Sequence, residues 1–210
     1  MSSTAPPTAK PGLRERKKQK TREAIQREAM RLFTKHGYEE TTIEQIAAGV
    51  EISPSTFFNY FPTKEDVVLY DAYDPMLASL MLDRPADEPL SVGLRHVLHL
   101  METIFTRDHD VILERAKLGL EVPALRARMW EEVQKAQVLL CGLVAHRTGR
   151  DPEDFELRVV VMVVVIAALE AMFEWVKRDG QGSFVEIVNQ ALDVVDAGAR
   201  LDAIAARPHA

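Results

Sequence analysis

The chain has 210 residues, with 26 Lys or Arg, 32 Asp or Glu and a formal net charge of −6. A net acidic chain is a poor general binder of polyanions, and its one cysteine, Cys141, excludes an internal disulfide or a multi-cysteine zinc site. The charge is uneven, however: residues 1–64 carry a net +4, whereas residues 65–210 carry −10. This asymmetry predicts a basic N-terminal part that approaches phosphates and a separate acidic body.

The N-terminal region divides into a tail and a helix. Residues 1–12 are rich in Pro, Ser, Thr and Ala, which predicts a disordered tail, and they lack the apolar core of a secretory signal. A helix is predicted over residues 21–35, ended by Gly37, with apolar side chains at helical spacing. The basic residues before it, Lys17, Lys18 and Lys20, are candidates for contacts with DNA phosphates, although a solvated charged face is the alternative.

Residues 42–61 predict two short helices joined by a tight turn. Thr42 can cap the first helix, with Gln45 at the spacing of a capping box. Ser53 can cap the second, and Pro54 then occupies the first helical position, where a missing N–H costs nothing. Helices this short are unstable alone in water, so each must pack against a neighbour.

The second of these helices has two distinct faces. Phe57 and Phe61 fall on one side and are expected in the core, whereas Ser55 and Asn59 point the opposite way, flanked by Thr56 and Phe58. Asn can bond two groups on an adenine edge, and Ser or Thr can bond base edges or phosphates. The pattern therefore predicts a recognition helix for the major groove, while an ordinary capped helix pair remains the alternative.

The stretch from Arg22 to Val68 resembles the tetracycline-repressor (TetR) family of bacterial transcriptional regulators. The matching residues are Ala29, Leu32, Phe33, Gly37, Thr41, Thr42, Ile46, Ala47, Ser53, Thr56, Tyr60, Phe61 and Lys64. The resemblance implies an all-α fold, with a three-helix helix–turn–helix DNA-binding domain over residues 13–62 and a larger helical ligand-binding and dimerisation domain over residues 63–206. It also implies a homodimeric regulator, not an enzyme, that binds a palindromic double-stranded DNA operator.

The resemblance also implies individual contacts. Residues at family positions for phosphate or other DNA contacts are Thr42, Thr56, Tyr60 and Lys64, and those at positions for base readout are Pro54, Ser55 and Asn59, with Ser53 as the cap. Two departures from the family pattern stand out. Glu51 replaces the usual turn glycine, which would cost about 1–2 kcal/mol if its backbone is left-handed. Phe58 replaces a frequent tyrosine, so a phosphate contact through that hydroxyl is lost.

Beyond residue 62 the chain again reads as helical, with no alternating strand pattern. Thr63 begins a helix that we expect to run to residue 82. This helix is expected to transmit signals between the domains. Residues 83–89, which include two prolines, then interrupt the helical pattern. Further helices are predicted near residues 90–107, 109–121, 123–148, 152–178 and 183–206, separated by Pro and Gly.

Residues 159–169 are wholly apolar. Eleven helical residues span about 16 Å against about 30 Å of hydrocarbon, so this run by itself is too short to cross a membrane. A helix that is apolar on all sides must be buried on all sides. We therefore expect the helices at 152–178 and 183–206 to form a four-helix bundle across a two-fold axis, with a central core helix in a monomer as the alternative.

The effector pocket is less evident. Large flexible or aromatic residues are candidate lining groups: Met101, Phe105, Trp130, Met162 and Phe173. Candidate polar anchors are His96, His99, Glu102, Cys141 and Glu170. The body also loosely resembles mycofactocin-associated and acyl-coenzyme A-responsive regulators, through FFNYFPTKEDVVLYDAYDP and LEVPALRAR, which implies a fatty-acyl or similarly amphipathic effector.

Catalytic and cofactor motifs such as HExxH or a phosphate-cradling glycine loop do not occur, so we expect no cofactor and no metal, although His96, His99 and Glu102 could share a helical face. The leading hypothesis is a cytoplasmic repressor released from its operator by a small apolar or amphipathic effector. An effector-independent DNA-binding dimer is the alternative, and a helical enzyme or metal-binding protein with an incidental helix pair is the third.

Overall fold

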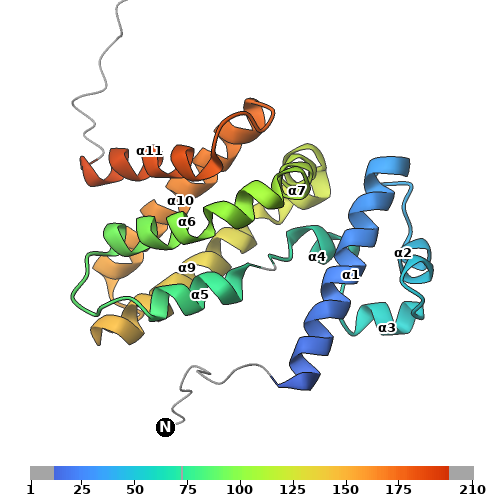
Figure 1. Cartoon of the computed structure of the whole chain (residues 1–210), viewed down its shortest axis with the longest axis horizontal. Coiled ribbons are helices and arrows are strands. Elements are labelled where there is room, and N and C mark those ends of the chain that lie inside the picture. Colours follow the sequence, from blue (N-terminus) through green and yellow to red (C-terminus); the bar gives the residue numbers. More distant parts are fainter. Residues whose placement is uncertain (1–11, 72, 199–210) are drawn as a thin grey trace, which may run out of the picture. The chain divides into compact units, whose positions relative to one another are not determined.

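A computed structural model describes residues 12–71 and 73–198, and these residues contain helices and no strand, as the all-α prediction requires (Figure 1). They form two compact units that divide after Tyr70. We call residues 12–70 the head and residues 71–198 the body. The predicted disordered tail lies outside the described residues except for Gly12.

The head contains α1 (Leu13–His36), α2 (Ile43–Gly49), α3 (Pro54–Phe58) and α4 (Lys64–Leu69). Side-chain caps begin the last three helices at Thr42, Ser53 and Thr63. All four helices contribute buried apolar side chains to the head, which include Ile25, Ala29, Leu32, Phe33, Ile46, Ala47, Phe57, Phe61, Val67 and Val68. Helix α1 begins eight residues before the expected Thr21, because residues 13–20 are mostly good helix formers even without an apolar face.

The expected single helix over residues 63–82 is wrong, because the chain leaves the helix after Leu69 and re-enters it at Asp74. Tyr70 is extended, with φ −62° and ψ 120°, and the carboxylate of Asp71 accepts a hydrogen bond from the backbone N–H of Tyr73 at 2.8 Å. Pro75 then lies in the first turn of α5, where its missing N–H costs nothing. The boundary between the units thus follows Tyr70, eight residues beyond the expected boundary at 62/63, because α4 packs into the head.

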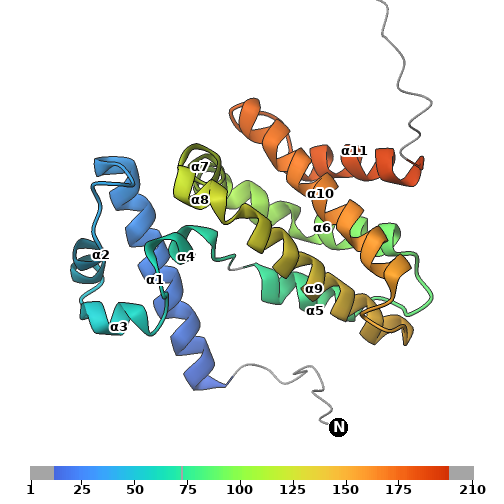
Figure 2. The ribbon, with the colours of Figure 1, turned by 180° about the vertical axis from the view of Figure 1, so that it is seen from behind.

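The body contains α5 (Asp74–Leu82), α6 (Leu90–Arg107), α7 (His109–Glu121), α8 (Pro123–Ala127), α9 (Met129–Thr148), α10 (Phe155–Lys177) and α11 (Phe184–Asp196), seen from both sides in Figures 1 and 2. The expected helix over 123–148 is interrupted at Arg128, whose N–H bonds the carbonyl of Leu125 at 3.1 Å. Helix α11 ends at Asp196, so the remainder of the expected helix to residue 206 lies almost wholly outside the described residues.

Helix α10 lies beside α9 and α11 and contributes Leu157, Val161, Val164, Ala171 and Trp175 to the body's core. It has 23 residues, and by length and composition alone it could cross a membrane, with a mean hydropathy of 2.3 over an 18-residue window. The apolar run of eleven residues was judged too short to cross a membrane, but the helix that contains it is long enough, so that argument is wrong. Helix α10 instead packs one side against α9 and α11 and there belongs to the body's core.

The sequence suggested that α10 is buried on all sides, but within one chain it is not. Only 22% of its most apolar window is buried, and Val159, Val163 and Ile166 are more than 40% exposed. These three positions are four and three residues apart, so they form one stripe along the helix.

Candidate nucleic-acid interface and effector pocket

Helix α3 separates an apolar and a polar face, as its sequence predicted. Phe57 is fully buried and Phe61 is 2% exposed, so this side anchors the helix in the head's core. Pro54, Ser55 and Asn59 are exposed on the surface of the head. A short helix held from one side in this way presents its small polar groups to solvent, which is the arrangement that major-groove recognition requires.

The hydroxyl groups at the start of α3 are linked to one another. Ser53 Oγ accepts a hydrogen bond from the backbone N–H of Thr56 at 3.1 Å, which caps the helix. The same oxygen lies 2.8 Å from Ser55 Oγ and 2.8 Å from Thr56 Oγ1, and either partner can donate in each pair. Ser53 thus links the hydroxyls of Ser55 and Thr56 into one cluster, in which Ser55 is exposed to solvent.

The turn between α2 and α3 contains Glu51 in the left-handed region, with φ 56°. The strain that the sequence suggested at this position is therefore present in the fold. Glu51 is exposed, and its N–H bonds the carbonyl of Ala48 at 3.2 Å. Thr42, at the start of α2, forms the predicted capping box with Gln45 and is exposed.

Lys64 has a different environment from a free phosphate-binding lysine. Its ammonium donates hydrogen bonds to the main-chain carbonyls of Tyr38 at 2.7 Å and Thr41 at 3.2 Å. The nitrogen also lies 4.1 Å from the centre of the Tyr38 ring, a cation–π arrangement. The charge of Lys64 therefore ties the start of α4 to the loop between α1 and α2.

The other predicted contact residues lie on the surface of the head or partly within it. Lys17, Lys18 and Lys20 are exposed on the first turns of α1, whereas Thr56 and Tyr60 are partly buried. The predicted set of DNA contacts remains a prediction at the level of individual residues.

Gln26 is a functional candidate that the sequence did not indicate. It is 9% exposed within the apolar face of α1, and its Nε2 donates to the carbonyl of Val67 at 2.9 Å and to that of Tyr70 at 2.8 Å. Tyr70 in turn donates from its hydroxyl to Gln19 Oε1 at 2.7 Å. The available signal was a polar residue beside Ile25 in an otherwise apolar line.

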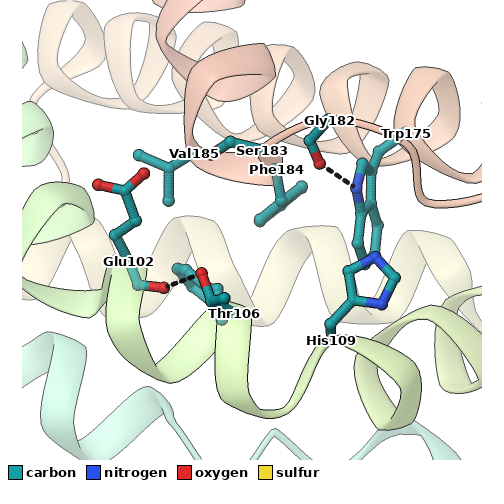
Figure 3. Close-up of a pocket in the computed structure, with 9 residues that line it drawn as sticks. Glu102, Thr106, His109, Trp175, Gly182, Ser183, Phe184 and Val185 are labelled. Atoms are coloured by element: carbon teal, nitrogen blue, oxygen red, sulfur yellow. Dashed lines mark hydrogen bonds between the residues drawn. The ribbon is translucent and has the colours of Figure 1, made fainter.

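The body holds a pocket of about 310 Å³ among the end of α6, the start of α7, the end of α10 and the start of α11 (Figure 3). Its lining residues are Glu102, Phe105, Thr106, His109, Trp175, Gly182, Ser183, Phe184 and Val185. Three aromatic rings form much of its wall: the rings of Phe105 and Phe184 are 5.4 Å apart, and those of Trp175 and Phe184 are also 5.4 Å apart.

His109 joins the pocket wall to the turn between α10 and α11. Its Nε2 lies 2.9 Å from the carbonyl oxygen of Gly180, and its Nδ1 lies 2.8 Å from the carboxylate of Asp110. The Gly180 carbonyl, followed by the Asp110 carboxylate, raises the pKa of His109 above its ordinary value. With an acceptor at each ring nitrogen, the doubly protonated imidazolium is the form that satisfies both contacts.

The structure brings together only part of the predicted pocket. Phe105 and Glu102 line it, whereas Met101 is fully buried with Met81 and Val97 in a cluster against which Phe105 packs. Trp130 is 58% exposed, and Met162 and Phe173 do not line this pocket. Of the remaining polar anchors, Cys141 is buried in another cluster, and His96, His99 and Glu170 lie on the surface outside this pocket.

An exposed recognition helix on a small helical head, followed by a larger helical body, defines a helix–turn–helix transcriptional regulator with a separate regulatory domain. Comparisons agree: residues 25–70 match the family model "Bacterial regulatory proteins, tetR family", and residues 88–200 match "MftR C-terminal domain". The chain is 36% identical to the HTH-type transcriptional regulator TcmR of Streptomyces glaucescens over 177 residues, which cover 80% of this chain and 78% of TcmR.

Solved structures of similar fold include FadR of Thermus thermophilus, a TetR family transcriptional repressor in complex with lauroyl-CoA. It has a TM-score of 0.56 and 28% identity and covers 90% of this chain and 100% of its own. The fatty acid degradation regulator FadR of Bacillus halodurans has a TM-score of 0.58 at 19% identity, covering 91% and 99%. The chain belongs to the TetR family of bacterial transcriptional regulators, which are DNA-binding proteins and not enzymes.

Proposed function

We propose that this regulator is a cytoplasmic homodimeric repressor that binds a palindromic operator and is released by a small apolar or amphipathic effector. The observation that carries the proposal is the exposure of Ser55 on α3 and of Asn59 at its C-cap, opposite the fully buried Phe57. The exposed lysines at the start of α1, Lys17, Lys18 and Lys20, supply positive charge for adjacent phosphates.

A dimer is supported by the apolar stripe on α10. Val159, Val163 and Ile166 remain more than 40% exposed in a single chain, on a helix next to α11. Covering such a stripe with the same stripe of a second copy gives a two-fold, self-complementary interface. Two heads related by this symmetry would address two half-sites about one helical turn apart, or a multiple of that distance, on the same operator.

An effector is supported by the pocket in the body. Aromatic walls from Phe105, Trp175 and Phe184 favour an apolar group, while Glu102 and Ser183 offer polar contacts. FadR of Thermus thermophilus was solved in complex with lauroyl-CoA, which makes an acyl compound one candidate here. The ionisable side chains of the lining are Glu102 and His109, so the pocket suits an acyl chain or another apolar group better than a polyphosphate.

DNA binding is tested with the full chain and operators selected from random-sequence duplexes. Asn59→Ala should weaken binding to the selected operator by about 1–3 kcal/mol, because one bidentate base contact is lost. Asp87→Asn, an exposed change between α5 and α6, is the matched control and should bind normally. An Asn59→Ala protein with unchanged affinity and unchanged operator preference would remove α3 from base readout.

The effector is tested by thermal shift and operator release with lauric acid, lauroyl-CoA and small aromatic compounds. A ligand specific for the native state should raise the melting temperature and lower operator affinity. Thr106→Phe places a ring in the pocket and should abolish both effects, whereas Thr103→Phe, exposed on α6 outside the lining, should retain them. Operator binding that responds to none of these compounds would favour the effector-independent dimer.

A further inference from the structure

Phe58 is an unusual side chain for the surface of the head. Phe33, Phe57 and Phe61 are buried in the head's core, but Phe58 is 50% exposed. Among the described residues of the head, the other large hydrophobic side chain exposed to this degree is Leu13, at the first turn of α1. Phe58 therefore stands apart as an apolar group on the helix that carries the polar recognition residues.

The position of the Phe58 ring is defined by its neighbours. Phe58 is the last residue of α3 and follows Ser55 by three residues, so these two exposed side chains lie on the same side of the helix, and the exposed Asn59 follows as its C-cap. Its ring packs edge-to-face on the buried Phe57, with centroids 5.7 Å apart and planes at 89°. The ring is thus held by the core beneath it while half of its surface faces outward.

The chemistry of this ring limits what it can contact on DNA. A phenyl ring has no hydrogen-bond donor for a phosphate and no charge, so the backbone of a duplex offers it little. Within the major groove, the apolar group on the base edges is the C5-methyl of thymine, and phenylalanine is a suitable partner for it. Burying the exposed half of the ring against that methyl removes apolar surface of both molecules from water.

We propose that Phe58 is a specificity-determining residue that reads the C5-methyl group of a thymine in each operator half-site. The inference rests on the proposed operator binding through α3 and adds to it a class of recognised group. It also distinguishes this protein from one with a tyrosine at the same position, where the hydroxyl could bond a phosphate. Ser55 and Asn59 would then donate or accept hydrogen bonds, and Phe58 would supply the apolar contact from the same exposed surface.

The test compares thymine with uracil, which lacks only this methyl. The full chain is measured by fluorescence anisotropy against the best duplex selected from a random-sequence pool, prepared once with thymine and once with uracil at every thymine position. Substitution at single positions then locates the methyl. Loss of one methyl contact should weaken binding about three- to five-fold per half-site, because one buried CH₂ or CH₃ group contributes about 0.8 kcal/mol.

Variants connect the effect to this side chain. Phe58→Ala should bind the thymine and uracil duplexes with equal affinity, and Phe58→Leu, which keeps an apolar contact, should retain part of the difference. Asn59→Ala should weaken both duplexes but keep their ratio, because it removes a hydrogen bond and not the methyl contact. Circular dichroism melting confirms that each variant is folded, and where Phe58→Ala fails to fold, the reduced thymine preference of Phe58→Leu takes its place in the comparison.

The outcomes separate the inference from the proposed function. Equal wild-type affinity for thymine and uracil duplexes overturns the role of Phe58 while operator binding stands. A thymine preference that survives in folded Phe58→Ala assigns the methyl contact to another residue and also overturns it. If no duplex is selected at all, operator binding itself is refuted.

Discussion

The side-chain amide of Gln26 on α1 donates a hydrogen bond to the main-chain oxygen of Tyr70 at 2.8 Å, and a second one to that of Val67 at 2.9 Å. These carbonyls belong to the end of α4, where a helix leaves its last carbonyls without partners inside the helix. Gln26 supplies those partners from a buried position, so it fixes the end of α4 to α1 immediately before the boundary between head and body.

Gln26→Leu should destabilise the head by about 1–3 kcal/mol, because it leaves buried carbonyls without donors. Native-state hydrogen exchange of the amides in α4 measures this directly, without requiring two-state unfolding of the whole chain. Gln19→Ala removes the part-buried acceptor for the Tyr70 hydroxyl and a hydrogen bond to Glu23, but it leaves the carbonyls at the end of α4 paired, so it should cost less. Unchanged exchange in Gln26→Leu would show that water replaces the amide without loss.

Glu51→Gly should stabilise the head by about 1 kcal/mol. The left-handed backbone at φ 56° costs about 1–2 kcal/mol for a residue with a Cβ, and the greater flexibility of glycine in the unfolded chain offsets part of the gain. Glu51→Ala is the matched control, because it removes the same carboxylate but keeps the Cβ. If the melting temperature rose equally for Glu51→Gly and Glu51→Ala, the stabilisation would come from loss of the carboxylate charge and not from relief of backbone strain.

Lys64→Met should weaken operator binding without changing its salt dependence. The Lys64 ammonium bonds the carbonyls of Tyr38 and Thr41, so its loss disturbs the loop before α2 and leaves the number of neutralised phosphates unchanged. In contrast, Lys17→Ala or Lys18→Ala should each reduce the slope of log affinity against log salt by about 0.9 if that lysine contacts a phosphate. If Lys64→Met reduced this slope by a similar amount, Lys64 would be a phosphate contact after all.

The stability of the body should fall as pH rises past the ordinary pKa of histidine and then through the raised pKa of His109. Its pKa in the folded state is raised above 6.5, so its contribution is fully present below the unfolded-state pKa and is lost as pH passes the folded-state pKa. The difference in melting temperature between wild type and His109→Gln measures this. That difference should shrink toward high pH, and a constant difference would refute the protonated bridge between Asp110 and Gly180.

The fold and the recognition helix follow from local signals in the sequence. Thr42 and Ser53 mark the starts of α2 and α3 by capping, and Phe57 marks the buried side by spacing alone. The breaks at Tyr70 and Arg128 were missed, because the residues around them are compatible with a helix and neither position is a Gly or Pro.

The pocket could be predicted only in part, for a different reason. Phe105 and Phe184 are far apart in the chain and meet only after α6 and α11 pack together. Trp130 has the chemistry of a pocket residue, but the register of α9 turns it to the surface. Residue type indicates which side chains can line a cavity, and tertiary packing decides which of them do.

The linked hydroxyls of Ser53, Ser55 and Thr56 have a consequence for how operators evolve. Each hydroxyl can rotate, so the cluster can present either a proton or a lone pair to the groove while every heavy atom stays in place. If Ser55 contacts a base edge as proposed, a base pair that is inverted in the operator meets the opposite polarity at the cost of a bond rotation. The operator sequence could then change at that position without any compensating substitution in the protein.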